Sequence, residues 1–393
     1  YNVNYHDELW DVIGGVSAQN FRSNHFGHLT YVGNDALAAA ILDDSGRYTY
    51  YGSDAFKGDY SAFVKAALNL GEHWDIFGDL QYRRVDYRTD GLNDKFVYNK
   101  ADGTYSNQVL DVDKHYNFFN PKGGVSYTNG AHRAYASVAL SHREPERNNF
   151  TDNYNYPAPV AESLIDYEAG YQLNAGKVRA GVNLYYMDYR NQFVQTGQVS
   201  DIGENLTTNI AKSYRAGAEL TLAWDVTRWL TLEGNAALSA NRILDFDEYV
   251  EDWDDSEDGY RVIHYNESTL AFSPSAILNG FADFHFGDFN AVWHTGFVGR
   301  QYLDNTANAD RSLPAYTCSD INFGYTFRFT GALKELRLGL TLNNVFNSHF
   351  ATSGWVYSAI AGSYGHPEDN RYYQLGFVPN AGFTALGNVV LRF

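Results

Sequence analysis

The sequence predicts an all-β chain that crosses a membrane as an antiparallel up-and-down β-barrel. Apolar and polar residues alternate with period two, for example over residues 60–70, which is typical of a strand with one apolar and one wet face. Tyrosine is abundant, at 32 of 393 residues, and suits the interfacial girdles of such barrels. The chain ends in a strand pattern, with Val389, Leu391 and Phe393 on one face. These observations favour a closed barrel over a soluble domain.

The second face of the predicted strands is too polar for a dry core. Over residues 74–83 it carries Asp75, Asp79, Gln81 and Arg83, which would be costly to bury unpaired. The polar face is therefore expected to contact water and the apolar face lipid. Mean hydropathy is −0.42 and no run of about 18 apolar residues exists, which argues against a transmembrane helix. Strands of about 9–11 tilted residues cross the same thickness.

Short turns and long polar segments alternate along the chain. The alternation predicts tight periplasmic turns, long extracellular loops and about fourteen strands, within one barrel portion that spans residues 1–393. A sandwich of short soluble strands is disfavoured because the strands run to about 12 residues, against a norm of about 5–6. The turns are predicted at residues 71–73, 128–130, 174–176, 225–228, 286–288 and 331–334, and the long segments at residues 21–58, 89–114, 144–161, 196–206, 247–268, 303–314 and 351–380.

Six stretches of the chain carry motifs that occur together in one family. They read FNPKGGVSY at 119–127, SHREPER at 141–147, EAGY at 168–171, NIAKSYRAGAEL at 209–220, VGRQY at 298–302 and LTLNNVFNSHF at 340–350. In this order, and on predicted strands, they resemble the C-terminal barrel of TonB-dependent outer-membrane receptors. The resemblance covers roughly residues 115–393, and the earlier part of the chain fits by pattern alone.

The resemblance implies a plug domain followed by a barrel of about twenty-two strands. This chain would supply about fourteen of those strands and no plug, so we expect a C-terminal portion of a longer protein. An open sheet would otherwise leave unpaired strand edges in lipid. A complete, smaller passive porin of about fourteen strands is the alternative.

The implied function is active import across the bacterial outer membrane, most simply of a ferric siderophore or similar iron chelate. A haem, vitamin or oligosaccharide receptor of the same family is a further alternative. The implied partners are outer-membrane lipid, lipopolysaccharide, the missing strands and plug, and the TonB energy-transducing complex, which would engage an N-terminal region absent from this chain. Nucleic acid is not expected, since the formal net charge is −18.

Motifs for catalysis are absent from the sequence. It shows no Gly-x-Ser-x-Gly elbow, no Cys-x-x-Cys, no His-Glu-x-x-His and no phosphate-binding Gly-rich loop with Lys. Cys318 is the single cysteine, so no intrachain disulfide is expected. We therefore predict a transporter and not an enzyme, with no cofactor and no resident metal.

Candidate ligand contacts lie in the long segments. Arg143 and Arg147, at a strand exit, could bind an anionic chelate, because guanidinium groups form bidentate bonds to carboxylates. Pairing of both arginines with nearby acids such as Glu144 is the alternative. The aromatic candidates, offered as stacking surfaces, are Tyr154 and Tyr156 in the segment that follows, and Trp355 and Tyr357 in the last long segment.

Two further groups suggest metal chemistry. His25 and His28, with Tyr50 and Tyr51, are candidate haem ligands. Residues 243–260 contain nine carboxylates and no Lys or Arg, and residues 254–259 copy the first half of a calcium loop. The twelfth loop position is Tyr265 where a bidentate Glu is required, so that motif fails. A solvated, mobile extracellular loop, or one bridged to lipopolysaccharide by divalent ions, is the simpler interpretation.

Overall fold

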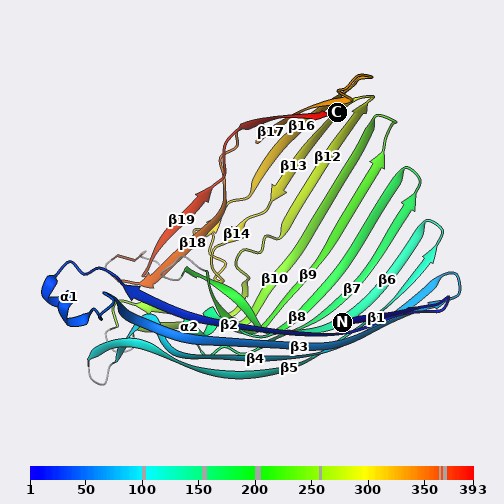
Figure 1. Ribbon diagram of the computed structural model, residues 1–393. Helices are drawn as coiled ribbons and strands as arrows, with labels where there is room; N and C mark the ends of the chain where they lie inside the picture. Colours follow the sequence, from blue (N-terminus) through cyan, green and yellow to red (C-terminus); the bar gives the residue numbers. More distant parts are fainter. Residues whose placement is uncertain (100–102, 153–156, 200–204, 256–258, 363, 366–369) are drawn as a thin grey trace. The chain divides into compact units, whose positions relative to one another are not determined.

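The structure, a computed structural model, describes the chain except residues 100–102, 153–156, 200–204, 256–258, 363 and 366–369 (Figure 1). Within that part it has two short helices, α1 Asp35–Ile41 and α2 Arg147–Thr151, and no helix long and apolar enough to span a membrane. The strands are β1 Asn2–His6, β2 Trp10–Leu29, β3 Tyr48–Leu70, β4 Trp74–Asn99, β5 Thr104–Asn129, β6 His132–Arg143, β7 Glu162–Ala175, β8 Val178–Val199, β9 Asn205–Asp225, β10 Leu230–Asp252, β11 Tyr260–Thr269, β12 Ala276–Phe286, β13 Phe289–Val298, β14 Gln301–Tyr302, β15 Ser312–Leu313, β16 Tyr316–Arg328, β17 Glu335–Asn343, β18 Ala351–Ile360, β19 Arg371–Pro379 and β20 Thr384–Arg392.

The described residues form two compact units. Unit 1 comprises Tyr1–Leu68, Phe77–Lys122 and Leu140–Ala161, and holds β1, β2 and most of β3 to β5. Unit 2 comprises Asn69–Ile76, Gly123–Ala139 and Glu162–Phe393, and holds β7 to β20. In both units consecutive long strands pair antiparallel, which confirms the predicted all-β, antiparallel fold class.

The six predicted short turns all fall at junctions between consecutive strands, although the preceding strand extends one or two residues into four of them. The turn before β4, for example, occupies residues 71–73. Four turns use a glycine in the left-handed region, which a residue with a Cβ adopts only with strain. These glycines are Gly71, Gly130, Gly176 and Gly287, with φ between 57° and 69°. A turn that the sequence analysis missed joins β1 to β2, where the Asp7 carboxylate accepts the backbone N–H groups of Leu9 and Trp10 at 2.8 and 2.6 Å.

The predicted number of strands is recovered once accessory strands are set aside. Of the twenty strands in the described residues, β1 is a five-residue strand, and β11, β14, β15, β18 and β19 lie in or at the edge of segments predicted as long loops. The other fourteen are the strands that the alternation predicts. The long antiparallel strands β7 to β10, β12 and β13 run side by side in Figure 1.

In unit 1, antiparallel pairing of β2 with β3 gathers apolar side chains on one face. Trp10 lies opposite Leu68, and Val16 opposite Ala62, so both strands present their apolar residues together. Further along, the other face carries polar pairs, as in Ser17 opposite Ser61 and Gln19 opposite Asp59. Alternation along each strand therefore gives this sheet one apolar and one polar face.

In unit 2, strand β9 shows the same separation. Leu220, Leu222 and Trp224 are 42–51% exposed on one face, as expected for side chains that contact lipid. Glu219 lies on the opposite face and accepts a hydrogen bond from the Asn183 amide of β8 at 3.3 Å. A one-residue slip would exchange the two sets, so the carboxylate fixes the register.

We predict that arginine at position 220 destabilises the barrel while arginine at 221 does not. The apolar face of β9 runs from Tyr214 to Trp224, which places Leu220 near the middle of the lipid band. Leu220→Arg is expected to lower the free energy of unfolding by about 2–4 kcal/mol. Thr221 is the neighbour of Leu220 on the polar face, and Thr221→Arg should change the free energy of unfolding by less than about 1 kcal/mol. Urea unfolding of the full-length protein in lipid vesicles measures both, and equal effects would contradict this assignment of faces.

The loops are shorter than the long segments predicted for them, because strands extend into these segments. Residues 21–58 contain the ends of β2 and β3, and only residues 30–47 connect them, with α1 capped by the Asn34 side chain. The segments 247–268 and 351–380 are hairpins, β10–β11 and β18–β19. The sequence signal failed because strands beyond the lipid need no continuous apolar face, and buried apolar residues such as Val250 and Val356 stand there among polar ones. The apolar alternation ends there, although backbone pairing continues.

Candidate functional site

The strand exit after β6 is anchored in unit 1 by a buried carboxylate. Glu144 accepts hydrogen bonds from the Lys57 ammonium at 2.7 Å and from the Arg83 guanidinium at 2.8 and 3.0 Å. Arg83 also binds Asp59, at 2.6 Å. Because Glu144 is buried and has two cationic partners, it fixes where the chain leaves β6 and starts α2.

Helix α2 then carries Arg147 to a site lined by neutral hydroxyl groups. Its guanidinium donates to Thr89 Oγ1 at 2.8 Å and to Ser53 Oγ at 3.3 Å, and both hydroxyl-bearing residues are buried. No carboxylate in the described part of the chain lies within ion-pair distance of Arg147. A half-buried guanidinium without an anion is the feature of this site that favours an anionic ligand.

Two further polar groups surround Arg147. The Tyr87 side chain is 93% buried, stacks on Phe150 at 5.6 Å, and its hydroxyl has no hydrogen-bond partner among the described residues. Burial and the positive charge of Arg147 lower the pKa of His25, which keeps this imidazole neutral at pH 7. The site therefore concentrates one fixed positive charge among neutral donors, an arrangement suited to the oxygens of an anion.

The other ligand contacts predicted near this strand exit, Arg143, Tyr154 and Tyr156, do not join Arg147 in the described site. Arg143 is exposed at the end of β6 and is not part of the Arg147 site described above. Tyr154 and Tyr156 lie outside the described residues. The alternative was that both arginines pair with Glu144, Glu146 or lumenal acids. For Arg147 it is wrong in the described part of the chain, where Glu144 binds Lys57 and Arg83 instead, and for Arg143 it stays a prediction.

In unit 2, a buried ion pair joins hairpins β10–β11 and β18–β19. The Arg371 guanidinium donates to the Glu248 carboxylate at 2.7 and 2.9 Å, and only 3% of the Arg371 side chain is exposed. Tyr265 donates to the same carboxylate at 3.1 Å, and burial together with Glu248 raises the pKa of Tyr265 to about 12. Two parallel backbone pairs, Glu251 with Ala359 and Asp252 with Ile360, continue the junction.

Tyr357 and Trp355 lie on β18 beside this junction. The Tyr357 hydroxyl donates to Glu251, and its ring lies 6.3 Å from that of Trp253. The Trp355 indole lies over Gly376 of β19, where a Cβ would collide with the ring. Both aromatics retain exposed surface that a planar ligand group could contact.

The acidic segment is neither free nor a cation site in the described residues. Asp252 is buried and pairs with Arg261 at 2.7 Å, Asp247 pairs with His264 at 2.8 Å, and Asp254 accepts the Gly362 N–H at 2.7 Å. No group of three or more His, Cys, Asp or Glu side chains that could hold a metal ion occurs in the part of the chain that the structure describes. Protein donors therefore hold these carboxylates, and Asp252 is buried, whereas Asp247 and Asp254 remain exposed to solvent.

The haem hypothesis is not supported by the placement of its histidines. His25 and His28 are three residues apart on the continuous strand β2, so alternation directs their side chains to opposite faces. His28 hydrogen-bonds to Thr49 at 2.9 Å, whereas Tyr50 and Tyr51 both lie against Gly27. Two histidines that diverge in this way do not ligate one iron.

Several residues of these sites escaped the sequence analysis. Arg83 and Arg371 look like ordinary polar residues of strands, and nothing near them in sequence marks them. Glu248 belongs to the acidic segment 243–260, but nothing in the sequence indicates its partner. Arg371 and Glu248 are 123 residues apart, so only the folded chain brings them together. A weak signal was available for Arg83, since alternation assigned it to the polar face.

Comparison with known proteins supports the class indicated by these strands. The family model for "TonB dependent receptor-like, beta-barrel" matches residues 1–345. The chain is also similar in fold to the ferric-catecholate import receptor Fiu from E. coli K12, with 14% identity and a TM-score of 0.66 over 100% of this chain and 53% of that one. No curated protein sequence matches it.

Other solved structures of similar fold include the ferric yersiniabactin uptake receptor FyuA from Yersinia pestis, with 15% identity, a TM-score of 0.64, and 99% of this chain and 52% of that one covered. The copper transporter OprC has 13% identity and a TM-score of 0.67, with 99% and 55% covered. This chain thus spans about half the length of these structures.

These strands are therefore those of an outer-membrane receptor barrel. The chain belongs to the TonB-dependent receptor-like β-barrel family, since the family model matches most of its length. This confirms the resemblance drawn from the six sequence motifs. The family consists of outer-membrane transporters and receptors.

Proposed function

We propose that this chain is the barrel portion of an active outer-membrane transporter for a ferric siderophore or similar anionic iron chelate. It would act with further barrel strands, a plug and the TonB complex, which powers the transport. The observation that carries the proposal is the half-buried Arg147 guanidinium, which hydrogen-bonds to hydroxyl groups and has no carboxylate partner among the residues that the structure describes. Fiu and FyuA, named as receptors for ferric chelates, support the proposal by their fold.

Import of bare copper ions, suggested by OprC, is the second candidate. Soft thiolate and thioether ligands favour Cu(I), and this chain contains one Cys and one Met. The sulfur of that methionine, Met187, accepts a hydrogen bond from Tyr189 at 3.6 Å. In a metal chelate the chelator already fills the coordination sphere of the metal. The protein then recognises the chelator, through charged donors and aromatic surfaces. Arg147 and Trp355 are groups of these kinds.

Ligand titration of the purified full-length protein tests the proposal. We expect quenching of tryptophan fluorescence to saturate with an anionic ferric tris-catecholate or ferric citrate. A neutral ferric hydroxamate should bind more weakly, because it lacks the charge that Arg147 recognises. If the protein binds Cu²⁺ saturably but binds no ferric chelate, the proposal is wrong and import of copper is supported. Steady ionic conductance in planar bilayers without saturable binding would favour a passive porin.

A further inference from the structure

Tyr87 of β4 carries a buried hydroxyl that lacks an acceptor beside the Arg147 guanidinium. The residue is buried, and its hydroxyl forms no hydrogen bond with any residue that the structure describes. Burial raises the pKa of Tyr87, and the positive charge of Arg147 opposes that rise. The hydroxyl therefore keeps its proton at pH 7 and is a buried donor without a partner in the described chain.

Donors outnumber acceptors around this hydroxyl. A guanidinium group has five N–H donors and no acceptor, so Arg147 cannot accept the Tyr87 proton. Arg147 itself donates to Thr89 Oγ1 at 2.8 Å and to Ser53 Oγ at 3.3 Å, and both acceptors are neutral. A buried donor without an acceptor destabilises a folded chain. The group that would complete this site is an oxygen that accepts from Tyr87 and Arg147 together.

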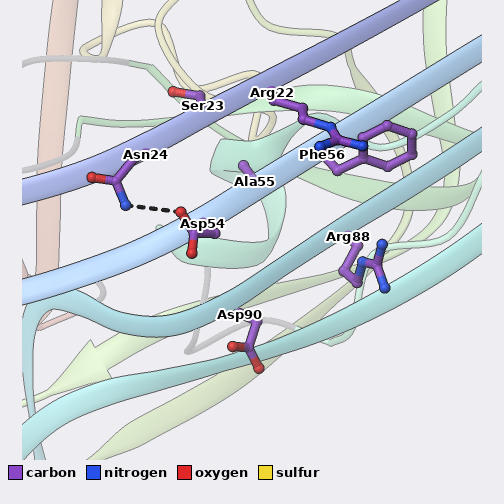
Figure 2. A pocket seen from close by; sticks show the side chains of 8 residues that line it. All are labelled: Arg22, Ser23, Asn24, Asp54, Ala55, Phe56, Arg88 and Asp90. Atoms are coloured by element: carbon purple, nitrogen blue, oxygen red, sulfur yellow. Dashed lines mark hydrogen bonds between the residues drawn. The ribbon is translucent and has the colours of Figure 1, made fainter.

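Acidic residues next to the site in sequence have other partners or lie on another face. Asp152, at the end of α2, pairs with Lys95 at 3.3 Å. Asp54 of β3 and Asp90 of β4 are exposed on the opposite face of their strands, where Figure 2 shows both in a separate groove. None of these carboxylates therefore accepts from Tyr87.

We propose that Tyr87 is a specificity-determining residue, whose hydroxyl donates to a carboxylate of the iron chelate while Arg147 binds the same carboxylate. The inference rests on the proposed transport function and narrows its ligand to chelates with a carboxylate free of iron. Such a carboxylate has two oxygens with open lone pairs, so it can accept from the guanidinium and the hydroxyl at once. The oxygens of a ferric tris-catecholate are all bound to the metal, which makes them poorer acceptors.

The carboxylate reaches Tyr87 through a small movement of helix α2. Two side chains of α2 lie against the tyrosine, since the Phe150 ring stacks on it at 5.6 Å and the charge of Arg147 acts on its hydroxyl. The contact of Arg147 with Ser53, at 3.3 Å, is the longer of its two hydrogen bonds, so the guanidinium can turn toward a ligand with little loss. Because α2 has only five residues, the movement is local.

Isothermal titration calorimetry of the purified full-length protein tests this role. The probe is ferric dicitrate, whose citrates carry carboxylates that do not coordinate iron, and it is compared with ferric tris-catecholate. Tyr87→Phe is expected to weaken binding of ferric dicitrate about tenfold or more, because a hydrogen bond to a charged group is lost. Binding of the tris-catecholate should stay within about twofold, because Tyr87 donates no such hydrogen bond to it.

The stability of the ligand-free protein separates recognition from a structural role. Tyr87→Phe removes a buried hydroxyl without an acceptor, so the urea midpoint of unfolding should rise or stay unchanged. Removal of a hydroxyl that holds the fold together would lower this midpoint. Tyr82→Phe is the matched control, because Tyr82 lies on the other face of β4 and its hydroxyl donates to Asn117 at 2.7 Å. It should leave the affinity for both chelates unchanged.

Three results would overturn the role of Tyr87. They are equal affinity of Tyr87→Phe and the wild type for ferric dicitrate, equal losses for the two chelates, and a lower urea midpoint in Tyr87→Phe. If Arg147→Gln weakens binding of ferric dicitrate while Tyr87→Phe does not, the transport function stands and the role of Tyr87 is wrong. If the wild type binds neither chelate, the proposed transport function itself fails, and the role of Tyr87 fails with it.

Discussion

Replacing Arg147 by glutamine is expected to weaken binding of an anionic ferric chelate to the full-length receptor by about tenfold to a hundredfold. The guanidinium is half-buried and its protein partners are the neutral hydroxyl groups of Thr89 and Ser53. A ligand anion would supply the missing charge, and a hydrogen bond to a charged group contributes about 1.5–3 kcal/mol. Titration by tryptophan fluorescence measures the change.

The controls for Arg147 separate ligand recognition from folding. Arg147→Lys keeps the charge and should recover part of the affinity, although it loses the planar fork. Arg84→Gln removes the same charge as Arg147→Gln, but on the face of β4 that is opposite to Thr89. It should leave the affinity for the chelate unchanged. If Arg147→Gln binds an anionic chelate as tightly as the wild type, Arg147 is a structural residue and another group holds the ligand.

Arg371→Met is expected to lower the stability of the joined hairpins β10–β11 and β18–β19 by about 3–5 kcal/mol. It leaves the Glu248 carboxylate in a mostly buried site without its cation, and breaking a buried ion pair costs about that much. Hydrogen exchange of the backbone amides of β18 and β19 measures the loss. Opening of these hairpins should become faster while the long strands keep their protection.

The double variant Arg371→Met/Glu248→Gln should recover much of this loss, because it removes the unpaired charge. Asp247→Asn is the matched control. Asp247 lies beside Glu248 on β10, but its ion pair with His264 of β11 is exposed. Its effect should be small. Equal protection in Arg371→Met and the wild type would show that the backbone pairing of β10 with β18 holds the junction by itself.

Periodicity predicted the strands of the lipid band and the turns on one side of it. Leu220, Leu222 and Trp224 had to share a face because Glu219 and Thr221 could not enter hydrocarbon. That constraint disappears beyond the lipid, where polar residues such as Glu248 of β10 alternate irregularly with buried apolar residues such as Val250 of β10 and Val356 of β18. The hairpins there depend on backbone pairing and on partners distant in sequence, such as Arg371 with Glu248, which no local pattern reveals.

The candidate site was predicted in part. Arg147 was found because its motif resembles a strand exit of the family, yet its surroundings were not, because Ser53 and Thr89 come from other strands.

Uptake of ferric chelate by living cells tests the transport function most directly. Cells that express the full-length receptor would be given ⁵⁵Fe-labelled ferric chelates, with the TonB complex either intact or deleted. We expect saturable uptake of an anionic chelate that is lost without the TonB complex and strongly reduced by Arg147→Gln. Uptake that rises linearly with concentration, and that continues unchanged without the TonB complex, would identify a passive pore and contradict the account.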